Sequence, residues 1–359
     1  MTRHASKLTA NALPLLIGSV PMDNHDAATA LVFDHTPDIP LWVQLPKYPS
    51  EGMVEQFIDG LPGLKREGDK TFIDSTSPEF EGQVLEFFEE YLAVTEAGQD
   101  IDQSRFILPE DKCKGVTALL ERVGQLPSPP FALKGQVTGP VTFGTGVTDQ
   151  DERAIFYDDQ LRDIMVKRLA MNALWQARHF KTRGAIPIVF IDEPALAGLG
   201  TSAYITITRE TVTQTIEEIA RAIHQEGGYA GVHVCANTEW DLLLEADIDI
   251  ISFDAYLYFE RFILYPEQIR QFLERGGILA WGIVPTLNPE DIRKETVESL
   301  LMKFYDQVAQ MEDIGIDRAK LLGQCFITPS CGTGPLTLDL AQRVLALTRD
   351  LSFVIREDG

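Results

Sequence analysis

The sequence predicts an α/β fold, a single (β/α)8 TIM barrel, on three observations. First, eight short apolar runs recur along the 359 residues, and several are apolar throughout, as in parallel strands buried on both faces. Second, amphipathic helical patterns separate most of these runs, which is typical of a (β/α)8 barrel. Third, no glycine-rich dinucleotide-binding motif follows the first run, which disfavours a doubly wound open sheet. The predicted strands are 15–20, 41–45, 131–137, 188–192, 231–235, 248–254, 278–284 and 322–328.

The clearest helical patterns lie between or after the later strands. They cover residues 158–182, 209–225, 266–275, 294–312 and 337–351. Glycine follows most of these patterns before the next apolar run, at Gly184, Gly227, Gly276 and Gly315. Glycine at this place commonly ends a helix, because it adopts the left-handed backbone conformation without steric cost.

The second and third predicted strands are separated by a long stretch, residues 46–130. It contains two helical patterns, 78–97 and 114–124, and ends in the proline-rich segment 127–130. We interpret it as an elaborated connection between strands 2 and 3 that caps the barrel mouth. Residues 1–359 are therefore expected to form one domain.

Composition excludes several classes of function. The formal net charge is −23, from 54 acidic and 31 basic residues, so binding to nucleic acid or to an anionic membrane is not expected. No apolar stretch is long enough to span a bilayer, and no secretory signal opens the chain. Four cysteines in a chain of this length do not make a disulfide framework. A cytoplasmic protein with reduced thiols is expected.

His233 and Cys235 make the first candidate site. Residues i and i+2 of a strand point to the same face, so an imidazole and a sulfur would converge at the end of the fifth strand. Cys331 follows the eighth strand, and three such ligands with an open fourth position describe a catalytic zinc. Asp254, at the end of the sixth strand, is a candidate fourth ligand. The alternative is a buried cysteine beside a core histidine.

Polar residues at the ends of other strands favour the metal site. Ser19 ends the first strand, Gln44 the second, Gln136 and Thr138 the third, and Asp192 the fourth. In such barrels the chemistry lies at the C-terminal ends of the strands. Unrelated core residues would have no reason to gather at the same end.

Six segments together resemble the catalytic barrel of the cobalamin-independent methionine synthase family, within the uroporphyrinogen-decarboxylase-like superfamily. They fall in the family's order and extend over most of the chain. The segments are Ile17-Gly18-Ser19, Thr138-Gly139-Pro140-Val141-Thr142, Ile191-Asp192-Glu193-Pro194-Ala195-Leu196, His233-Val234-Cys235, 250–254 and Pro329-Ser330-Cys331-Gly332.

The resemblance implies roles for individual residues. Zinc would be held by His233, Cys235 and Cys331, and the family's glutamate ligand falls on Asp254, which is one methylene shorter. The homocysteine-binding segment falls on Ile17, Gly18 and Ser19, and the aspartate that binds the amine falls on Asp192. A further glutamate that binds the amino acid has no secure match within 44–49.

Other differences from the family concern the residues that contact the folate. The family's folate-stacking tryptophan falls near Gly146, and its folate-contacting glutamate falls on Gly198. A proton-donating histidine is expected near Thr286 or Leu287, where none is present. The sequence also contains no counterpart of the family's N-terminal folate-handling barrel.

The resemblance therefore implies a zinc-dependent thiol S-methyltransferase that converts homocysteine to methionine. A free thiol has a pKa of about 8.5, and coordination to zinc deprotonates it. Without the folate residues, the expected donor is a methylcobamide or a corrinoid protein, whose cobalt leaves without needing a proton. Gly144 and Gly146 are expected to leave space for such a bulky donor.

Three other functions stay open at this stage. A corrinoid-linked methyltransferase that acts on coenzyme M also carries His-x-Cys followed by a later cysteine. Uroporphyrinogen decarboxylase is disfavoured, because it uses no zinc. A non-catalytic protein that binds zinc or homocysteine would explain the departures at Asp254 and at 286–287.

Overall fold

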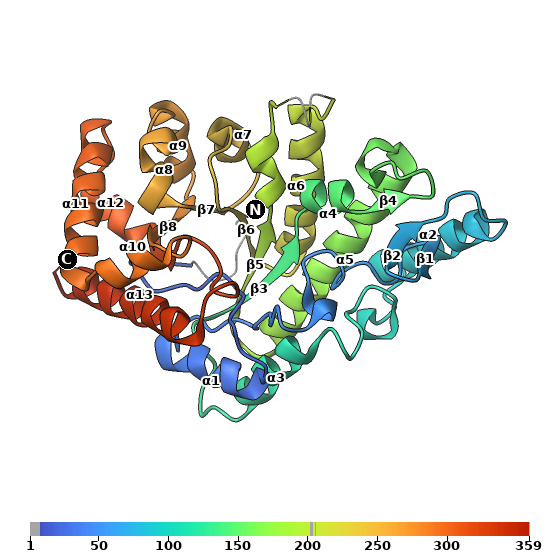
Figure 1. Cartoon of the computed structure of the whole chain (residues 1–359), viewed down its shortest axis with the longest axis horizontal. Helices are drawn as coiled ribbons and strands as arrows, with labels where there is room; N and C mark the ends of the chain where they lie inside the picture. The colour runs from blue at the N-terminus through green and yellow to red at the C-terminus, as the bar shows by residue number, and fades with distance from the viewer. Residues whose placement is uncertain (1–7, 202–203, 205, 359) are drawn as a thin grey trace.

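Six parallel strands form a curled sheet, and helices cover its outer side (Figure 1). The computed structural model describes residues 8–201, 204 and 206–358. The strand order is β3-β5-β6-β7-β8-β9, and every neighbouring pair is parallel. The strands are β3 (Ala132–Thr138), β5 (Ile186–Asp192), β6 (Tyr229–Val234), β7 (Ile250–Phe253), β8 (Ile278–Val284) and β9 (Cys325–Pro329).

Most helices begin at side chains that accept hydrogen bonds from free backbone N–H groups. Asp158 caps α5, Thr208 caps α6, and Thr296 and Ser299 form a capping box at α11. The helices are α1 (His25–His35), α2 (Phe80–Thr95), α3 (Lys114–Gly124), α4 (Pro140–Gly146), α5 (Asp159–Thr182), α6 (Arg209–Gln225), α7 (Trp240–Glu245), α8 (Ala255–Phe262), α9 (Pro266–Glu274), α10 (Pro289–Lys294), α11 (Val297–Asp313), α12 (Arg318–Gly323) and α13 (Leu338–Asp358).

The first two predicted strands, 15–20 and 41–45, do not form regular strands. They make single parallel bridges instead, Pro14 with Ile327, Ser19 with Gln44, and Leu41 with Lys134. Prolines at 14, 21, 40 and 46 bracket both runs, and proline cannot donate to a ladder.

These bridges place the two segments between β9 and β3, where strands 1 and 2 of a barrel belong. The fold is therefore TIM-barrel-like, but no closed eight-stranded barrel is present in the described part of the chain.

The other predicted elements agree to within a few residues at their ends, except that the last helix extends to Asp358, beyond the predicted end at residue 351. The strand 278–284 and the helices 114–124 and 209–225 have the predicted bounds. The last strand begins at Cys325 and not at residue 322, because Leu322 belongs to helix α12, which Asp317 caps.

The long connection 46–130 contributes two of the three strands of a small second sheet. Strands β1 (Leu64–Glu67) and β2 (Lys70–Ile73) form a hairpin, and β4 (Thr148–Asp149) pairs with β2. The hairpin and α2 project to one side, so they do not cap the mouth as predicted (Figure 1). From this connection, Pro46, Glu51, Gly52 and Met53 line the candidate site described below. The single-domain organisation stays a prediction.

Arg168 on α5 holds this connection. Its side chain is fully buried and donates from Nε to the carbonyl oxygen of Asp59 at 2.7 Å. Its other nitrogens donate to the carbonyl oxygens of Phe106 at 2.8 Å and Ile107 at 3.2 Å. Burial lowers the pKa of Arg168 to about 10. One buried cation therefore satisfies three backbone carbonyls of the connection.

Apolar side chains fill the lower part of the sheet's concave side. Ile188 and Phe190 on β5 pack with Ile250, Ala280 and Phe326 from other strands. Asp192 continues the same face of β5, so the polar residues begin where this core ends. No helix in the described ranges is both long and apolar enough to span a membrane.

The Arg168→Met variant should lower the free energy of unfolding by about 3 kcal/mol, because three buried carbonyl groups lose their donor. Urea denaturation followed by circular dichroism measures this loss. Arg221→Met, at an exposed position of α6, is the matched control and should stay within about 0.5 kcal/mol of the wild type. Equal stability of both variants would contradict the role of Arg168.

Candidate metal centre

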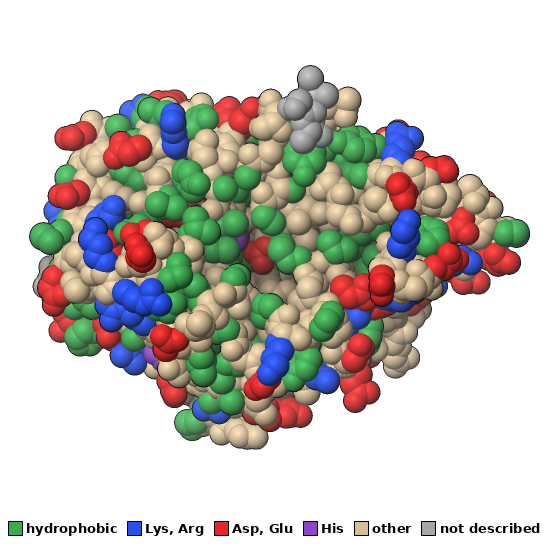
Figure 2. Space-filling view, in the orientation of Figure 1, with side chains coloured by type: hydrophobic (Ala, Val, Ile, Leu, Met, Phe, Trp, Pro, Cys, Tyr) green, Lys and Arg blue, Asp and Glu red, His purple; other side chains and the backbone are tan. Residues whose placement is uncertain are grey.

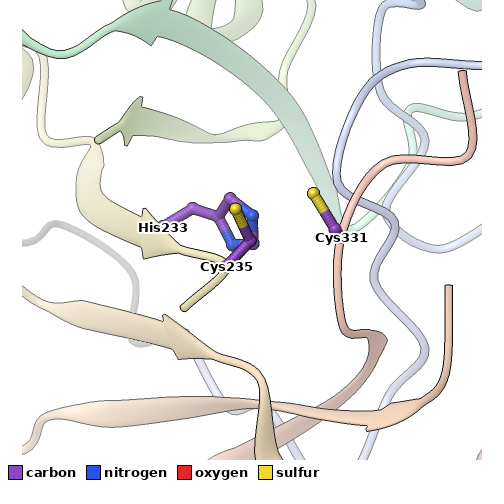
Figure 3. Close-up of side chains that lie close together, drawn as sticks. All are labelled: His233, Cys235 and Cys331. Carbon is purple, nitrogen blue, oxygen red and sulfur yellow. The ribbon is translucent and has the colours of Figure 1, made fainter. Parts of the chain in front are cut away.

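The side chains of His233, Cys235 and Cys331 converge at the C-terminal ends of the strands (Figure 3). One ligand atom from each residue lies within 4.8 Å of the other two. His233 lies on β6, Cys235 directly follows this strand, and Cys331 follows β9. Parallel strands that all end at one rim bring these residues together although almost 100 residues separate them in sequence.

Contacts on β7 orient the His233 ring. Its Nδ1 hydrogen-bonds to Ser252 Oγ at 2.9 Å, and the register of β6 on β7 places these two residues opposite each other. Its Nε2 is buried and has no hydrogen-bond partner within the described part of the chain. Buried polar atoms are normally paired, so a free Nε2 with a supported Nδ1 is the arrangement expected of a metal ligand.

The loop that carries Cys331 is held by two neighbours. Ser330 donates from its backbone to Val284 at 2.8 Å, and its hydroxyl lies 2.9 Å from that of Thr286. The backbone N–H of Thr333 donates to the Ser19 carbonyl at 2.9 Å. A Cβ at Gly332 would lie 2.2 Å from Ser19 Oγ, so a larger residue there would displace the Ser19 hydroxyl. Ser19 therefore helps to fix the position of Cys331.

The two cysteines are electrostatically coupled. A hydrogen bond from Cys331, aided by His233, lowers the pKa of the Cys235 thiol to about 4. The same hydrogen bond raises the pKa of the Cys331 thiol, because a second thiolate would repel the first. The protein alone therefore retains a proton on the pair, and a divalent cation would allow both sulfurs to ionise. One imidazole and two thiolates fit a zinc ion.

Asp254 does not belong to the group of three. Its Oδ1 accepts a hydrogen bond from the backbone N–H of Leu257 at 2.9 Å and so caps α8. Burial raises the pKa of Asp254 to about 6. Its ligation of the metal stays a prediction.

A cavity of about 280 Å³ opens beside the three ligands. Asp192 lines it, and its buried Oδ1 has no partner among the described residues. Burial raises the pKa of Asp192, whereas the charges of Lys134 and His233 lower it. Figure 2 shows this face hollowed near its centre, with histidine and acidic side chains in the hollow. The remaining lining residues are Ile17, Gly18, Ser19, Gln44, Pro46, Glu51, Gly52, Met53, Pro194, His233, Cys235, Cys331, Gly332 and Pro335.

Glu193 connects two of the sequence motifs, 191–196 and 138–142, next to this cavity. Its carboxylate accepts hydrogen bonds from the backbone N–H groups of Val141 at 2.8 Å and Thr142 at 2.9 Å, and from the Thr142 hydroxyl at 2.7 Å. A Cβ at Gly139 would lie 2.1 Å from Glu193, so this glycine makes room for the carboxylate. These hydrogen bonds of Glu193 fix the backbone of the neighbouring Asp192.

The sequence analysis did not identify two residues of the site: Glu51, which lines the cavity, and Ser252, which hydrogen-bonds to His233. Glu51 is buried, and it pairs with His25 Nε2 at 2.5 Å and with the backbone N–H of Leu45 at 2.7 Å. It lies in an irregular connection, where no periodic pattern of apolar residues indicates which way a side chain points. Ser252 could have been found, because it lies two residues before Asp254 on the same strand face.

The glycines expected to widen the mouth do not do so. A Cβ at Gly144 would lie 2.9 Å from Met165 and from Phe156, and one at Gly146 would lie 3.1 Å from Val54. Both glycines therefore allow close packing around α4. At Gly198 a Cβ would lie 2.5 Å from the Tyr204 ring, which fills the space beside this glycine.

Replacement of Cys235 or Cys331 by serine should weaken zinc binding by more than ~100-fold, since loss of an outer supporting residue alone costs about 10–100-fold. Metal analysis after dialysis and chelator competition measure the affinity. Cys113→Ser, in the long connection, is the matched control and should retain one zinc per chain. Full zinc retention by Cys331→Ser would exclude the three-residue site.

Removal of the Ser252 hydroxyl should have a smaller effect. In Ser252→Ala the His233 ring loses its Nδ1 partner, so zinc affinity should fall about 10-fold while one zinc per chain still binds at saturation. Ser352→Ala removes a buried hydroxyl that donates to Ala12 and serves as control. If both variants bind zinc like the wild type, Ser252 does not support the ligand.

No protein-family model and no curated protein matches this sequence. Several solved structures resemble it in fold, among them the following two. A methyltransferase from Methanosarcina mazei gives a TM-score of 0.51 at 13% identity, over 91% of this chain and 84% of its own. A protein assigned as a vitamin-B12-independent methionine synthase from Listeria monocytogenes gives 0.53 at 12% identity, over 95% of this chain and 98% of its own. The resemblance predicted from the motifs is confirmed at the level of the fold, which this chain shares with these two proteins.

Proposed function

We propose that this chain is a zinc-dependent thiol S-methyltransferase that methylates homocysteine to methionine. The observation that carries the proposal is the position of the His233, Cys235 and Cys331 group at a cavity lined by Asp192, whose Oδ1 has no hydrogen-bond partner in the described ranges. The fold that the chain shares with a methyltransferase and with a protein assigned as a methionine synthase supports the same reaction class.

Size and charge of the cavity favour an amino-acid thiol. About 280 Å³ accommodates a small molecule, near the lower end of ordinary ligand sites. The unpartnered Oδ1 of Asp192 would accept a hydrogen bond from the substrate ammonium group. Residues Ile17, Gly18 and Ser19 line the same cavity and would receive the carboxylate.

The protein's own contribution is orientation of the substrate. A zinc ion held by His233, Cys235 and Cys331 would supply the Lewis acidity that keeps a thiol deprotonated at neutral pH. Asp192 and Ile17–Ser19 fix the amino-acid end, so that the substrate sulfur lies toward the metal ligands. The donor methyl group must then approach from the open side of the cavity.

We further propose a methylcobamide, free or on a corrinoid protein, as the methyl donor. In this transfer the sulfur–carbon bond forms while the cobalt–carbon bond breaks, and both electrons of that bond stay on cobalt. The leaving group needs no proton, which agrees with Thr286 and an exposed Leu287 at the place expected for a proton donor. The donor does not fit inside the cavity and would dock at its mouth.

Single-turnover assays test the proposal directly. Zinc-loaded protein mixed with methylcobalamin and homocysteine should form methionine, detected by mass spectrometry, and removal of zinc should abolish it. No methionine from folded, zinc-loaded protein would contradict the corrinoid donor. Zinc binding without turnover of any methyl donor would favour a non-catalytic binding protein.

Thermal unfolding distinguishes the acceptor. A ligand at 100 times its Kd stabilises the folded state by about 2.7 kcal/mol. Homocysteine should protect the protein, whereas coenzyme M carries no ammonium group for Asp192 and should protect less. Stronger protection by coenzyme M would instead indicate that coenzyme M, and not homocysteine, is the methyl acceptor.

A further inference from the structure

Lys134 is a fully buried cation on the concave side of the sheet. It lies on β3, two residues before Gln136, and none of its surface is exposed. It does not line the cavity next to the metal ligands. Burying an ammonium group is costly unless it is paired or hydrogen-bonded, so its position calls for an explanation.

The ammonium group of Lys134 contacts the first segment of the chain. Its Nζ donates to the carbonyl oxygen of Ile17 at 2.5 Å and lies 3.4 Å from Gln136 Oε1. It also lies 4.4 Å from the centre of the Phe190 ring, within range of a cation–π contact. Burial lowers the pKa of Lys134 to about 8, whereas the charge of Asp192, which lines the candidate substrate site, raises it.

The backbone of Lys134 holds the second segment. Its N–H donates to the carbonyl oxygen of Pro40 at 3.0 Å, and its carbonyl oxygen accepts from the N–H of Trp42 at 3.3 Å. Residues 15–20 and 41–45 make single bridges where a barrel would have regular strands. Lys134 is therefore bonded to both segments, through its side chain to one and its backbone to the other.

The segment that follows Ile17 has little room to shift. A Cβ at Gly18 would lie 3.3 Å from the side chains of Gln136 and Gln44. Gln136 in turn contacts Lys134 and donates to the carbonyl oxygen of Trp42 at 3.1 Å. Gly18 and Ser19 line the cavity, and the backbone that carries them is held by the contacts of Ile17 with Lys134 and of Gly18 with Gln136.

We propose that Lys134 is a positioning residue that fixes the Ile17-Gly18-Ser19 backbone in the geometry that receives the substrate carboxylate. The substrate part of this inference rests on the proposed function, whereas the fixing of the segment does not. Lys134 acts through Ile17 and does not contact the substrate.

Hydrogen exchange measured without substrate tests the positioning. In Lys134→Met the amides of residues 15–20 should exchange at least ~10-fold faster than in the wild type, because their buried anchor is lost. Arg168→Met is the matched control, since it also removes a fully buried cation that donates to backbone carbonyls, but on α5. Its exchange at 15–20 should equal that of the wild type. Unchanged exchange in Lys134→Met would overturn the proposal.

Lys134→Gln guards against failure of the methionine variant to fold, because its amide retains a donor for the Ile17 carbonyl. It should give exchange rates between those of the wild type and Lys134→Met. If neither Lys134 variant folds while Arg168→Met does, Lys134 serves the stability of the whole sheet and the positioning role is wrong.

Substrate affinity separates this inference from the proposed function. By titration calorimetry, Lys134→Met should bind homocysteine at least ~10-fold more weakly than the wild type, with unchanged zinc content. Equal affinities would overturn the carboxylate-positioning role. Failure of the wild type to bind homocysteine would instead reject the proposed acceptor, and the exchange result would still decide whether Lys134 fixes the segment.

Discussion

The close approach of two sulfurs beside an imidazole is the constraint on which the rest of this rim depends. Within 4.8 Å of one another, Cys235 and Cys331 cannot both ionise without a nearby positive charge. The free Nε2 of His233 points to the same requirement. A divalent cation satisfies all three groups at once, and this is why the arrangement favours a metal centre over a cluster of core residues.

The surrounding motifs keep this group in place. Ser19 holds the Cys331 loop, Ser252 holds the His233 ring, and Glu193 ties the end of β5 to the start of α4. Each contact joins segments that are distant in sequence. The short motifs are therefore parts of one structure, in which Gly139 leaves space for the Glu193 carboxylate and Gly332 packs against the Ser19 hydroxyl.

The sequence was sufficient to predict the later strands, most helices and the meeting of the three candidate ligands, because parallel strands share one rim. It was not sufficient for the first two strands. Their apolar runs match the pattern of a buried strand, but flanking prolines and the Lys134 side chain replace the regular ladder. Glu51 was also beyond prediction, since it reaches the cavity from an irregular connection that only tertiary packing directs. Gly144 and Gly146 were misinterpreted, because glycine permits close packing as readily as open space.

X-ray absorption spectroscopy at the zinc edge tests the central claim most directly. For the zinc-loaded protein the account predicts two sulfur ligands at about 2.3 Å and nitrogen or oxygen ligands at about 2.0–2.1 Å. Addition of homocysteine should raise the sulfur count by one. A spectrum with no sulfur ligands, or with the same sulfur count after homocysteine is bound, would contradict the account.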